Sequence, residues 1–344
     1  MNRFSFLSQQ IDRSRLPVAL LSGFLGSGKT TLVNALLRDR RMAGTAVAVN
    51  EFGEVPLDRD LIDHGADKTV VLANGCLCCN LAGDMEDAVM RLFSRREGGS
   101  VPRFQRLIIE PSGLSDPAPI AQAILRNPVM SRAMRLEAIV TTVDSLFAEN
   151  QAARHPEFVK QVALADRLVV TKTDIATADA VERLLASLGD QNPAAPVLSA
   201  SFGVVDAALL FPPSFLDPSL ATAAAHRSGL FAERVDPDHL GRHAVVSLLA
   251  DRPLDWRAFD AWLRRVRIGY ADHLLRVKGM LDIEGTDGPV VIQGVHHVLN
   301  APVELDAWPA GERQSRLVLI ADRATIAFAS DSWAAALPGM TANK

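Results

Sequence analysis

A short stretch near the N-terminus has the residue types and spacing of a phosphate-binding loop. It runs Gly23-Phe24-Leu25-Gly26-Ser27-Gly28-Lys29-Thr30 and fits the pattern G-x-x-x-x-G-K-[ST]. In such a loop glycines let successive backbone N–H groups turn toward one anion, and the following helix adds its positive end. Lys29 can then reach the β- and γ-phosphates, and the Thr30 hydroxyl can ligate Mg²⁺. The stretch therefore predicts binding of a nucleoside triphosphate with Mg²⁺.

The elements around this loop are those that a phosphate loop requires. Val18–Leu21 is an apolar run typical of a buried strand. Thr31–Leu37 has the pattern of a helix, and we count Thr31 among the nucleotide-binding residues. The alternative is a chance glycine-rich turn, and the strand before and the helix after the full motif argue against it.

A second motif bears on the identity of the base. Thr171-Lys172-Thr173-Asp174 closely follows the apolar run Arg167–Val170 and fits [NT]-K-x-D. The Asp174 carboxylate can accept hydrogen bonds from guanine N1–H and the 2-amino group, a donor pair that adenine lacks. The Lys172 stem would cover one face of the base. Thr171 stands where Asn is commoner, which leaves the support of this loop open.

Two further segments complete the expected nucleotide site. Ser199-Ala200 follows the next apolar run and is a fainter candidate to offer a backbone N–H to guanine O6. The apolar stretch Leu107–Ile109 ends in Glu110, which we expect to hold Mg²⁺ through water, and the Gly113 amide is expected to read the γ-phosphate.

The segment Asn50–Glu54 ends another apolar run, and Glu51 or Glu54 could orient water or sense Mg²⁺. Its alternative interpretation is a polar loop at a strand end. The expected catalytic residues are therefore Lys29, Thr30, Glu110 and Glu51. The sequence offers no assignable water-positioning glutamine and no clear arginine finger, so it predicts slow intrinsic turnover.

All three cysteines lie together, in Cys76-Leu77-Cys78-Cys79. Thiolates select soft or borderline ions such as Zn²⁺, with Co²⁺, Ni²⁺ and Cu⁺ as competitors. The three can share one ion if the loop bends, and Glu54, a histidine, water or a partner's ligand would complete the tetrahedron. An incomplete shell suits transfer better than permanent structural binding. A vicinal disulfide or three unrelated buried cysteines are the alternatives.

Short apolar runs alternate with helical patterns from residue 16 to about 210, which predicts a P-loop α/β fold with a mostly parallel sheet flanked by helices. Ligands of such sheets gather at the carboxyl ends of the strands. The expected strands are Pro17–Leu21, Thr45–Asn50, Thr69–Leu72, Phe104–Ile109, Ala138–Val143, Arg167–Val170 and Pro196–Leu198, with helices that include Asp84–Arg95 and Asp179–Leu188.

The rest of the chain is expected to form a smaller unit. Residues 1–15 are an N-terminal extension, 16–210 the nucleotide-binding domain, 211–242 a linker, 243–334 a small α+β domain and 335–344 a tail. Within the α+β part we expect one helix, Trp256–Arg267, with strands at Ala244–Leu249, Leu274–Met280, Val290–Gln293 and Arg316–Ala321.

Composition excludes several classes of function. The chain has 344 residues, 48% of them hydrophobic and 22% charged, which is ordinary for a globular protein. Its net charge of −4 gives no global reason to expect nucleic acid or an anionic membrane. No apolar stretch approaches the ~20 residues that span a bilayer, and the first 15 residues lack a secretory h-region. We therefore expect a cytoplasmic protein.

The phosphate loop, Asn50–Glu54, the cysteine cluster and Thr171–Asp174 follow one another in an order that closely resembles the CobW-like family of P-loop metal-chaperone GTPases of the SIMIBI class. The resemblance also takes in Glu110–Ile120 and, in the last third of the chain, Leu275–Gly279 and Val291–His297, which look like that family's C-terminal domain. It implies GTP hydrolysis coupled to delivery of a metal, most often zinc, to a client metalloprotein. Related members serve cobalt insertion, so zinc and cobalt both stay open, as does a homo-oligomer.

One departure from many relatives concerns histidine, because the chain has no long histidine-rich tract near the linker. Only His226, His239 and His243 are present there, and we interpret them as solvated surface residues rather than ligands. His296 and His297 lie beside a strand, where a structural role is commoner than a second metal site. Bulk metal storage is not expected.

The sequence thus predicts a Mg²⁺-dependent GTPase that loads a metal on its three cysteines and releases it to a client. Two rival classes are a P-loop kinase acting on a small molecule, and a metal-dependent sensor in which GTP only gates association. The kinase lacks an evident acceptor site, and the guanine motif counts against it.

Overall fold

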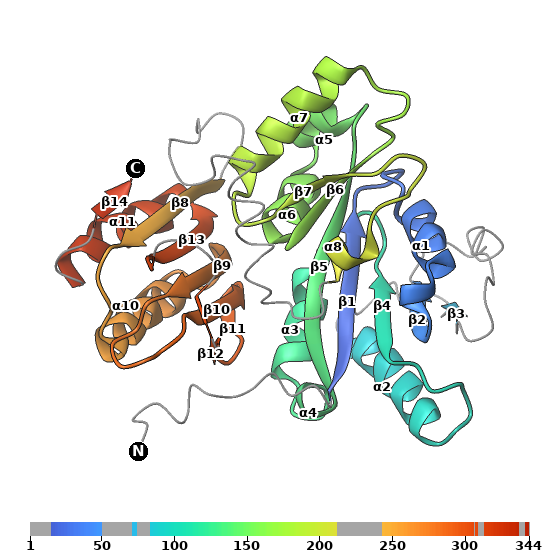
Figure 1. The fold of residues 1–344 in the computed structure, drawn as a ribbon, viewed down its shortest axis with the longest axis horizontal. Helices are drawn as coiled ribbons and strands as arrows, with labels where there is room; N and C mark the ends of the chain where they lie inside the picture. Colours follow the sequence, from blue (N-terminus) through green and yellow to red (C-terminus); the bar gives the residue numbers. More distant parts are fainter. Residues whose placement is uncertain are drawn as a thin grey trace. The chain divides into compact units, whose positions relative to one another are not determined.

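The computed structural model describes residues 15–49, 71–73, 83–211, 243–305, 307–308, 313–336 and 341–343, shown as the coloured ribbon of Figure 1. The chain divides into two compact units. Each unit contains one β-sheet, and each is described by itself below.

The first unit contains a seven-stranded sheet in the order β3-β2-β4-β1-β5-β6-β7. All of its strand pairs are parallel. Parallel strands have both faces covered, which explains the unbroken apolar runs Val18–Leu21 in β1 and Leu107–Ile109 in β4. The strands are β1 (Leu16–Gly23), β2 (Thr45–Val49), β3 (Val71–Ala73), β4 (Arg106–Glu110), β5 (Met134–Asp144), β6 (Arg167–Thr171) and β7 (Val197–Ser199).

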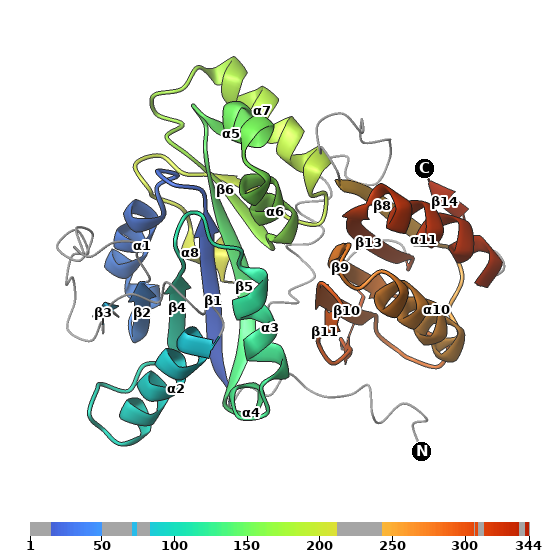
Figure 2. The same cartoon turned by 180° about the vertical axis from the view of Figure 1, so that it is seen from behind.

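Helices cover both faces of this sheet. One face, which bears Ala19 and Leu21, packs against α1 and α8 in a continuous apolar cluster. Figure 2 shows α3 and α6 in front of the other face. The helices are α1 (Lys29–Arg38), the short 3₁₀ helix η1 (Arg40–Met42), α2 (Gly83–Glu97), α3 (Ala118–Arg126), α4 (Met130–Ala133), α5 (Ala148–Arg154), α6 (Pro156–Leu164), α7 (Ala178–Gln191) and α8 (Ala207–Leu210).

The second unit is an antiparallel sheet with two long helices. Its strands run in the order β11-β10-β9-β13-β8-β14, and β12 also pairs with β10. The elements are β8 (His243–Ala250), α10 (Trp256–Gly269), β9 (Leu274–Leu281), β10 (Val290–Val295), β11 (Val298–Leu299), β12 (Val303–Glu304), β13 (Ser315–Asp322), α11 (Arg323–Ala336) and β14 (Thr341–Asn343).

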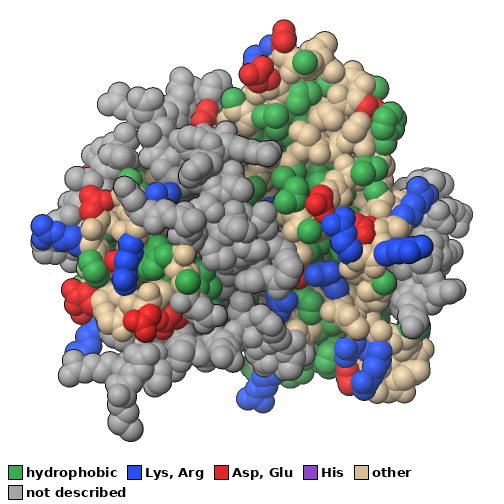
Figure 3. All heavy atoms as spheres, viewed as in Figure 1, with side chains coloured by type: hydrophobic (Ala, Val, Ile, Leu, Met, Phe, Trp, Pro, Cys, Tyr) green, Lys and Arg blue, Asp and Glu red, His purple; other side chains and the backbone are tan. Residues whose placement is uncertain are grey.

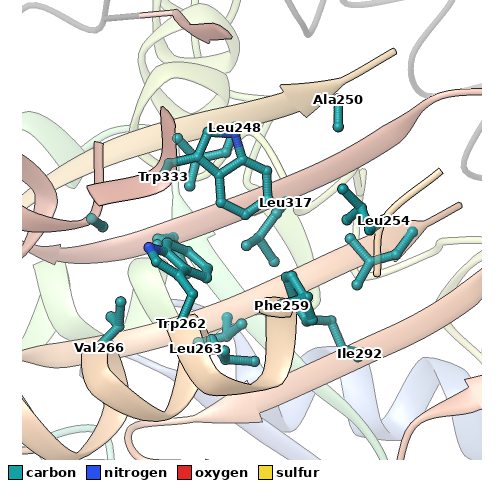
Figure 4. Packing of buried hydrophobic residues seen from close by; sticks show 14 of the residues in the cluster. Leu248, Ala250, Leu254, Phe259, Trp262, Leu263, Val266, Ile292, Leu317 and Trp333 are labelled. Atoms are coloured by element: carbon teal, nitrogen blue, oxygen red, sulfur yellow. The ribbon is translucent and has the colours of Figure 1, made fainter. Parts of the chain in front are cut away.

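Three buried aromatic side chains meet within the largely aliphatic core of the second unit (Figure 4). Trp262 of α10 and Trp333 of α11 meet edge to face, with ring centroids 4.7 Å apart. Phe259 lies 6.0 Å from Trp262 and 6.3 Å from Trp333, centroid to centroid. Edge-to-face aromatic pairs add stability beyond that of buried area alone, so these rings hold α10 and α11 on one face of the sheet.

The predicted fold class is confirmed. All seven strands expected in the first unit are present, and β5 is longer than the predicted Ala138–Val143. Helix α11 was not predicted, because its many Ala and Ser residues give no one-sided apolar stripe, and neither were the short strands β11, β12 and β14. Residues 212–242, nearly all of the predicted linker, lie outside the described residues, and the predicted domain boundaries stay predictions.

Charges of both signs occur together on the face seen in Figure 3, among apolar side chains of the described residues. This distribution agrees with the small net charge of −4. Within the described parts of the chain, no helix combines the length and apolar character that crossing a membrane requires.

Candidate functional site

The predicted phosphate loop lies between the end of β1 at Gly23 and the start of α1 at Lys29. Gly23, Gly26 and Gly28 all have positive φ, at 139°, 72° and 88°. A Cβ atom on Gly23 would lie 2.2 Å from Thr142 Oγ1, so no larger residue fits there. The Lys29 ammonium donates to the carbonyls of Gly23 at 3.0 Å and Phe24 at 3.3 Å, and so curls back over its own loop.

The neighbouring strand β5 fastens this loop. The hydroxyls of Ser27 and Thr142 are 2.7 Å apart and buried. Thr142 Oγ1 also lies 3.3 Å from the Ser22 carbonyl. Buried hydroxyl pairs of this kind fix a loop before ligand arrives, because leaving them unpaired in the interior would cost free energy. Nothing in the sequence pattern had identified Thr142.

Oxygen ligands suited to Mg²⁺ come together beside the loop. Thr30 Oγ1 donates to Glu110 Oε1 at 3.3 Å. Glu110 ends β4, the strand next to β1, and is only 4% exposed. A hydroxyl and a carboxylate oxygen are the donor types that Mg²⁺ prefers, so this pair fits a Mg²⁺ ion bound with the phosphates.

The segment after β4 passes directly against the phosphate loop. A Cβ on Gly113 would lie 2.7 Å from the Leu25 backbone nitrogen and 2.8 Å from its Cα. Only glycine permits so close an approach of two backbones. Gly113, the residue expected to read the γ-phosphate, therefore lies beside the loop expected to bind the phosphates.

The Thr171 hydroxyl joins the predicted guanine motif to the phosphate loop. Thr171 Oγ1 lies 2.7 Å from the Ser27 carbonyl and 3.2 Å from the Val143 carbonyl. The residue ends β6 and is 3% exposed. The sequence had left open what supports this loop when Thr replaces Asn. In the structure the shorter hydroxyl supplies that support.

Lys172 is held by an acidic residue that the sequence motifs did not single out. Its backbone has a positive φ of 58°, unusual for a residue other than glycine. Its ammonium lies 2.6 Å from Asp144 Oδ2. Asp144 ends β5, is 1% exposed, and accepts a second hydrogen bond at Oδ1 from the Leu146 amide at 2.9 Å. An acid at the end of an apolar run, as in Glu110, was the signal that could have identified it.

Asp174 lies where the loops after β6 and β7 meet. The Phe202 amide donates to Asp174 Oδ1 at 3.4 Å, and the Thr173 hydroxyl donates to the Ala200 carbonyl at 3.2 Å. The Ala200 N–H donates to Val170 at 2.7 Å. That amide is thus engaged with the sheet, and the donation of a backbone N–H from Ser199-Ala200 to guanine O6 stays a prediction. Ser199 lies next to it, as the last residue of β7.

Several predicted site residues lie outside the described parts of the chain. They are Glu51, Glu54, Cys76, Cys78 and Cys79, together with His226 and His239. The described strand β3 ends three residues before Cys76 and is parallel to β2. Among the described residues, no group of three or more His, Cys, Asp or Glu could hold a metal ion.

The other three histidines considered from the sequence belong to the second unit. His296 has a positive φ of 52° and donates its backbone N–H to Leu275 at 2.9 Å. The His297 carbonyl accepts from Arg267 Nη2 at 2.7 Å and Nε at 2.9 Å. His243 begins β8. His296 and His297 thus form a turn between β10 and β11, which agrees with the structural role preferred for them.

Comparison with known proteins finds two family matches, one in each part of the chain. The CobW/HypB/UreG nucleotide-binding domain matches residues 17–199, and the cobalamin synthesis protein cobW C-terminal domain matches residues 244–337. Zinc chaperone YjiA of Escherichia coli is 34% identical over 306 residues, which cover 89% of this chain and 93% of the relative. Zinc chaperone CobW of Pseudomonas aeruginosa is 30% identical over 356 residues, covering 91% of this chain and 90% of the relative.

A solved structure agrees in fold over nearly the same length. The Zn(II)-bound YjiA GTPase from E. coli superimposes with a TM-score of 0.66 at 29% sequence identity. The alignment covers 91% of this chain and 98% of that chain. The likeness therefore extends over both units.

Proposed function

We propose that this chain, which belongs to the CobW/HypB/UreG family of nucleotide-binding proteins, is a GTPase that binds zinc at Cys76, Cys78 and Cys79 and delivers it to a client metalloprotein. The names of two relatives, zinc chaperone YjiA and zinc chaperone CobW, support the metal and the task. A shorter match, to zinc-regulated GTPase metalloprotein activator 1 of Schizosaccharomyces pombe, is 31% identical over 199 residues. Its name supports a metalloprotein as the client.

One observation carries the nucleotide part of the proposal, and it is the 2.7 Å contact from the Thr171 hydroxyl to the Ser27 carbonyl. This contact joins the motif that would select guanine to the loop that would bind phosphates. A nucleotide that spans both must present a guanine at one end and a polyphosphate at the other. GTP and GDP meet that requirement.

The described residues have separate tasks in hydrolysis. Lys29 and the loop amides would neutralise charge on the transferring phosphoryl group. Thr30 and Glu110 would hold Mg²⁺, which supplies further charge neutralisation when bound. Gly113 would sense the γ-phosphate, and Asp174 would select guanine. Glu51 is proposed to orient water, and Glu54 to complete the zinc shell.

The metal is cargo in this proposal, so its site must be able to open. Three thiolates leave one tetrahedral position for Glu54 or for a ligand from the client. Because the reduced thiols required persist in the cytosol, we place the protein in the cytoplasm. Cobalt is the alternative cargo, since the same thiolate set accepts it.

The test compares turnover of GTP and ATP, with and without zinc, by wild type and by a triple variant Cys76→Ser, Cys78→Ser, Cys79→Ser. We expect GTP to be strongly preferred, and zinc affinity to be lost only in the triple variant. Equal use of both nucleotides would contradict the role of Asp174. Unchanged zinc affinity in the triple variant would contradict the thiolate site.

A client experiment separates a chaperone from a GTP-gated sensor. Lys29→Ala should block hydrolysis while the cysteines still load zinc. If the zinc-loaded variant no longer transfers metal to a co-purified apo client, delivery requires hydrolysis, as proposed. If transfer proceeds at the wild-type rate, GTP only gates association and the chaperone cycle is refuted.

A further inference from the structure

Gln161, in the middle of α6, is a fully buried polar residue that belongs to none of the nucleotide motifs. Its side chain is 0% exposed. Its amide nitrogen Nε2 donates to two backbone carbonyls at once, Gly113 at 3.1 Å and Ser115 at 3.0 Å. Both carbonyls lie in the segment after β4. A carboxamide is suited to this task, since its NH₂ group carries two donors.

The preceding residue of α6 holds the same segment. Lys160 Nζ lies 2.5 Å from Asp116 Oδ2, and Asp116 Oδ1 accepts from the Ala118 amide at 2.9 Å. The helix is itself tied to the sheet at this point, because the buried Thr141 hydroxyl of β5 donates to the Gln161 carbonyl at 3.1 Å. Two consecutive residues of a helix anchored to β5 therefore fix residues 113–116.

The same helix reaches the phosphate loop at its start. His155, at the N-cap of α6, packs its ring on Phe24 with centroids 4.6 Å apart. Gly113 in turn approaches Leu25 as closely as a glycine can. The phosphate loop, the segment after β4 and α6 thus contact one another pairwise. Figure 2 shows α6 on the sheet face away from α1 and α8.

We propose that Gln161 is a positioning residue for GTP hydrolysis, and this inference rests on the proposed GTPase function. By holding the carbonyls of Gly113 and Ser115, it fixes the backbone that faces the γ-phosphate. GDP lacks that phosphate and is bound by the phosphate loop and the guanine motif alone. Gln161 therefore matters for the triphosphate state and for turnover, and not for binding of GDP.

The primary experiment replaces Gln161 by Leu, which keeps the volume and removes both donors. We expect kcat for GTP to fall about tenfold, the effect of roughly one net hydrogen bond on a transition state. The dissociation constant for GTPγS should rise, and that for GDP should stay within about twofold of wild type. The split between GTPγS and GDP is the readout that a merely structural role would not produce.

A matched control uses Gln191, a buried glutamine of α7 whose Nε2 contacts Ser187 of its own helix at 3.1 Å. Gln191→Leu should leave kcat and the GTPγS-to-GDP affinity ratio unchanged. If Gln161→Leu does not fold, Gln161→Met serves instead, because its unbranched, flexible side chain fills a similar volume and likewise has no donor. It should show the same loss of turnover with GDP binding retained.

The outcomes separate this inference from the proposed function. If wild type does not hydrolyse GTP, the proposed function fails first. If wild type hydrolyses GTP and a folded Gln161 variant keeps its kcat, the positioning role is wrong. Equal weakening of GDP and GTPγS binding would also overturn it, because Gln161 would then support the whole nucleotide site and not the backbone beside the γ-phosphate in particular.

Discussion

Replacing Thr171 by Val tests whether one hydroxyl joins base selection to phosphate binding. Valine has nearly the same shape as threonine, so the change opens no cavity at this 3% exposed position. It removes the O–H that lies 2.7 Å from the Ser27 carbonyl and 3.2 Å from the Val143 carbonyl. What is lost is the tie between two loops that both touch the expected nucleotide.

The magnitude follows from the cost of a buried carbonyl left without its donor, about 1–3 kcal/mol. A change of ~1.4 kcal/mol is tenfold in an equilibrium constant. We therefore expect the affinity for GDP and for GTPγS to fall about tenfold, and by the same factor, because both ligands use both loops. KM for GTP should rise while kcat stays near that of wild type, since the residues around the γ-phosphate are untouched.

Isothermal titration calorimetry with GDP and GTPγS measures the effect directly. Thr171→Ser keeps the hydroxyl and should retain nearly wild-type affinity. The control Thr286→Val removes a hydroxyl that also contacts two carbonyls, Ile283 and Gly288 at 3.0 Å each, but in the second unit. It should lower stability without altering nucleotide affinity. Wild-type affinity in a folded Thr171→Val variant would refute the reasoning.

Four further changes have definite expected results. Asp174→Asn should weaken GTP binding about 100-fold and abolish the preference over ATP, as measured by competition, because charged hydrogen bonds to guanine are lost. Gly113→Ala should suppress GTP turnover and also weaken GDP binding, because its Cβ would meet the Leu25 backbone within the phosphate loop. Lys172→Met should cost about 2 kcal/mol in urea unfolding, because buried Asp144 loses its 2.6 Å partner while a third of Lys172 is exposed. Trp333→Ala should cost about 3–5 kcal/mol of stability in the second unit, read by the same denaturation.

The alternation of apolar runs and helical patterns along the sequence was sufficient to predict much of the fold. The strands of the first sheet are short apolar runs between helical patterns, and each lies where that pattern predicted it. The phosphate loop, Glu110 and the Thr171–Asp174 motif are contiguous or end a strand, so their spacing alone identified them. Helix α11 was not predicted from its sequence, because its many Ala and Ser residues form no apolar stripe along one side of the helix.

Only tertiary structure decided which polar residues join these motifs. Thr171 and Ser27 are 144 residues apart, Gln161 and Gly113 are 48 apart, and Lys172 and Asp144 are 28 apart. A buried glutamine in a short helix has the same sequence pattern as a solvated one. Its partner is set by how α6 lies on the sheet and by which strand neighbours which, and these depend on packing across the whole unit. The sequence motifs thus predicted which residues would bind the nucleotide and Mg²⁺. The order of the parallel strands determined which other residues contact them and hold the site together.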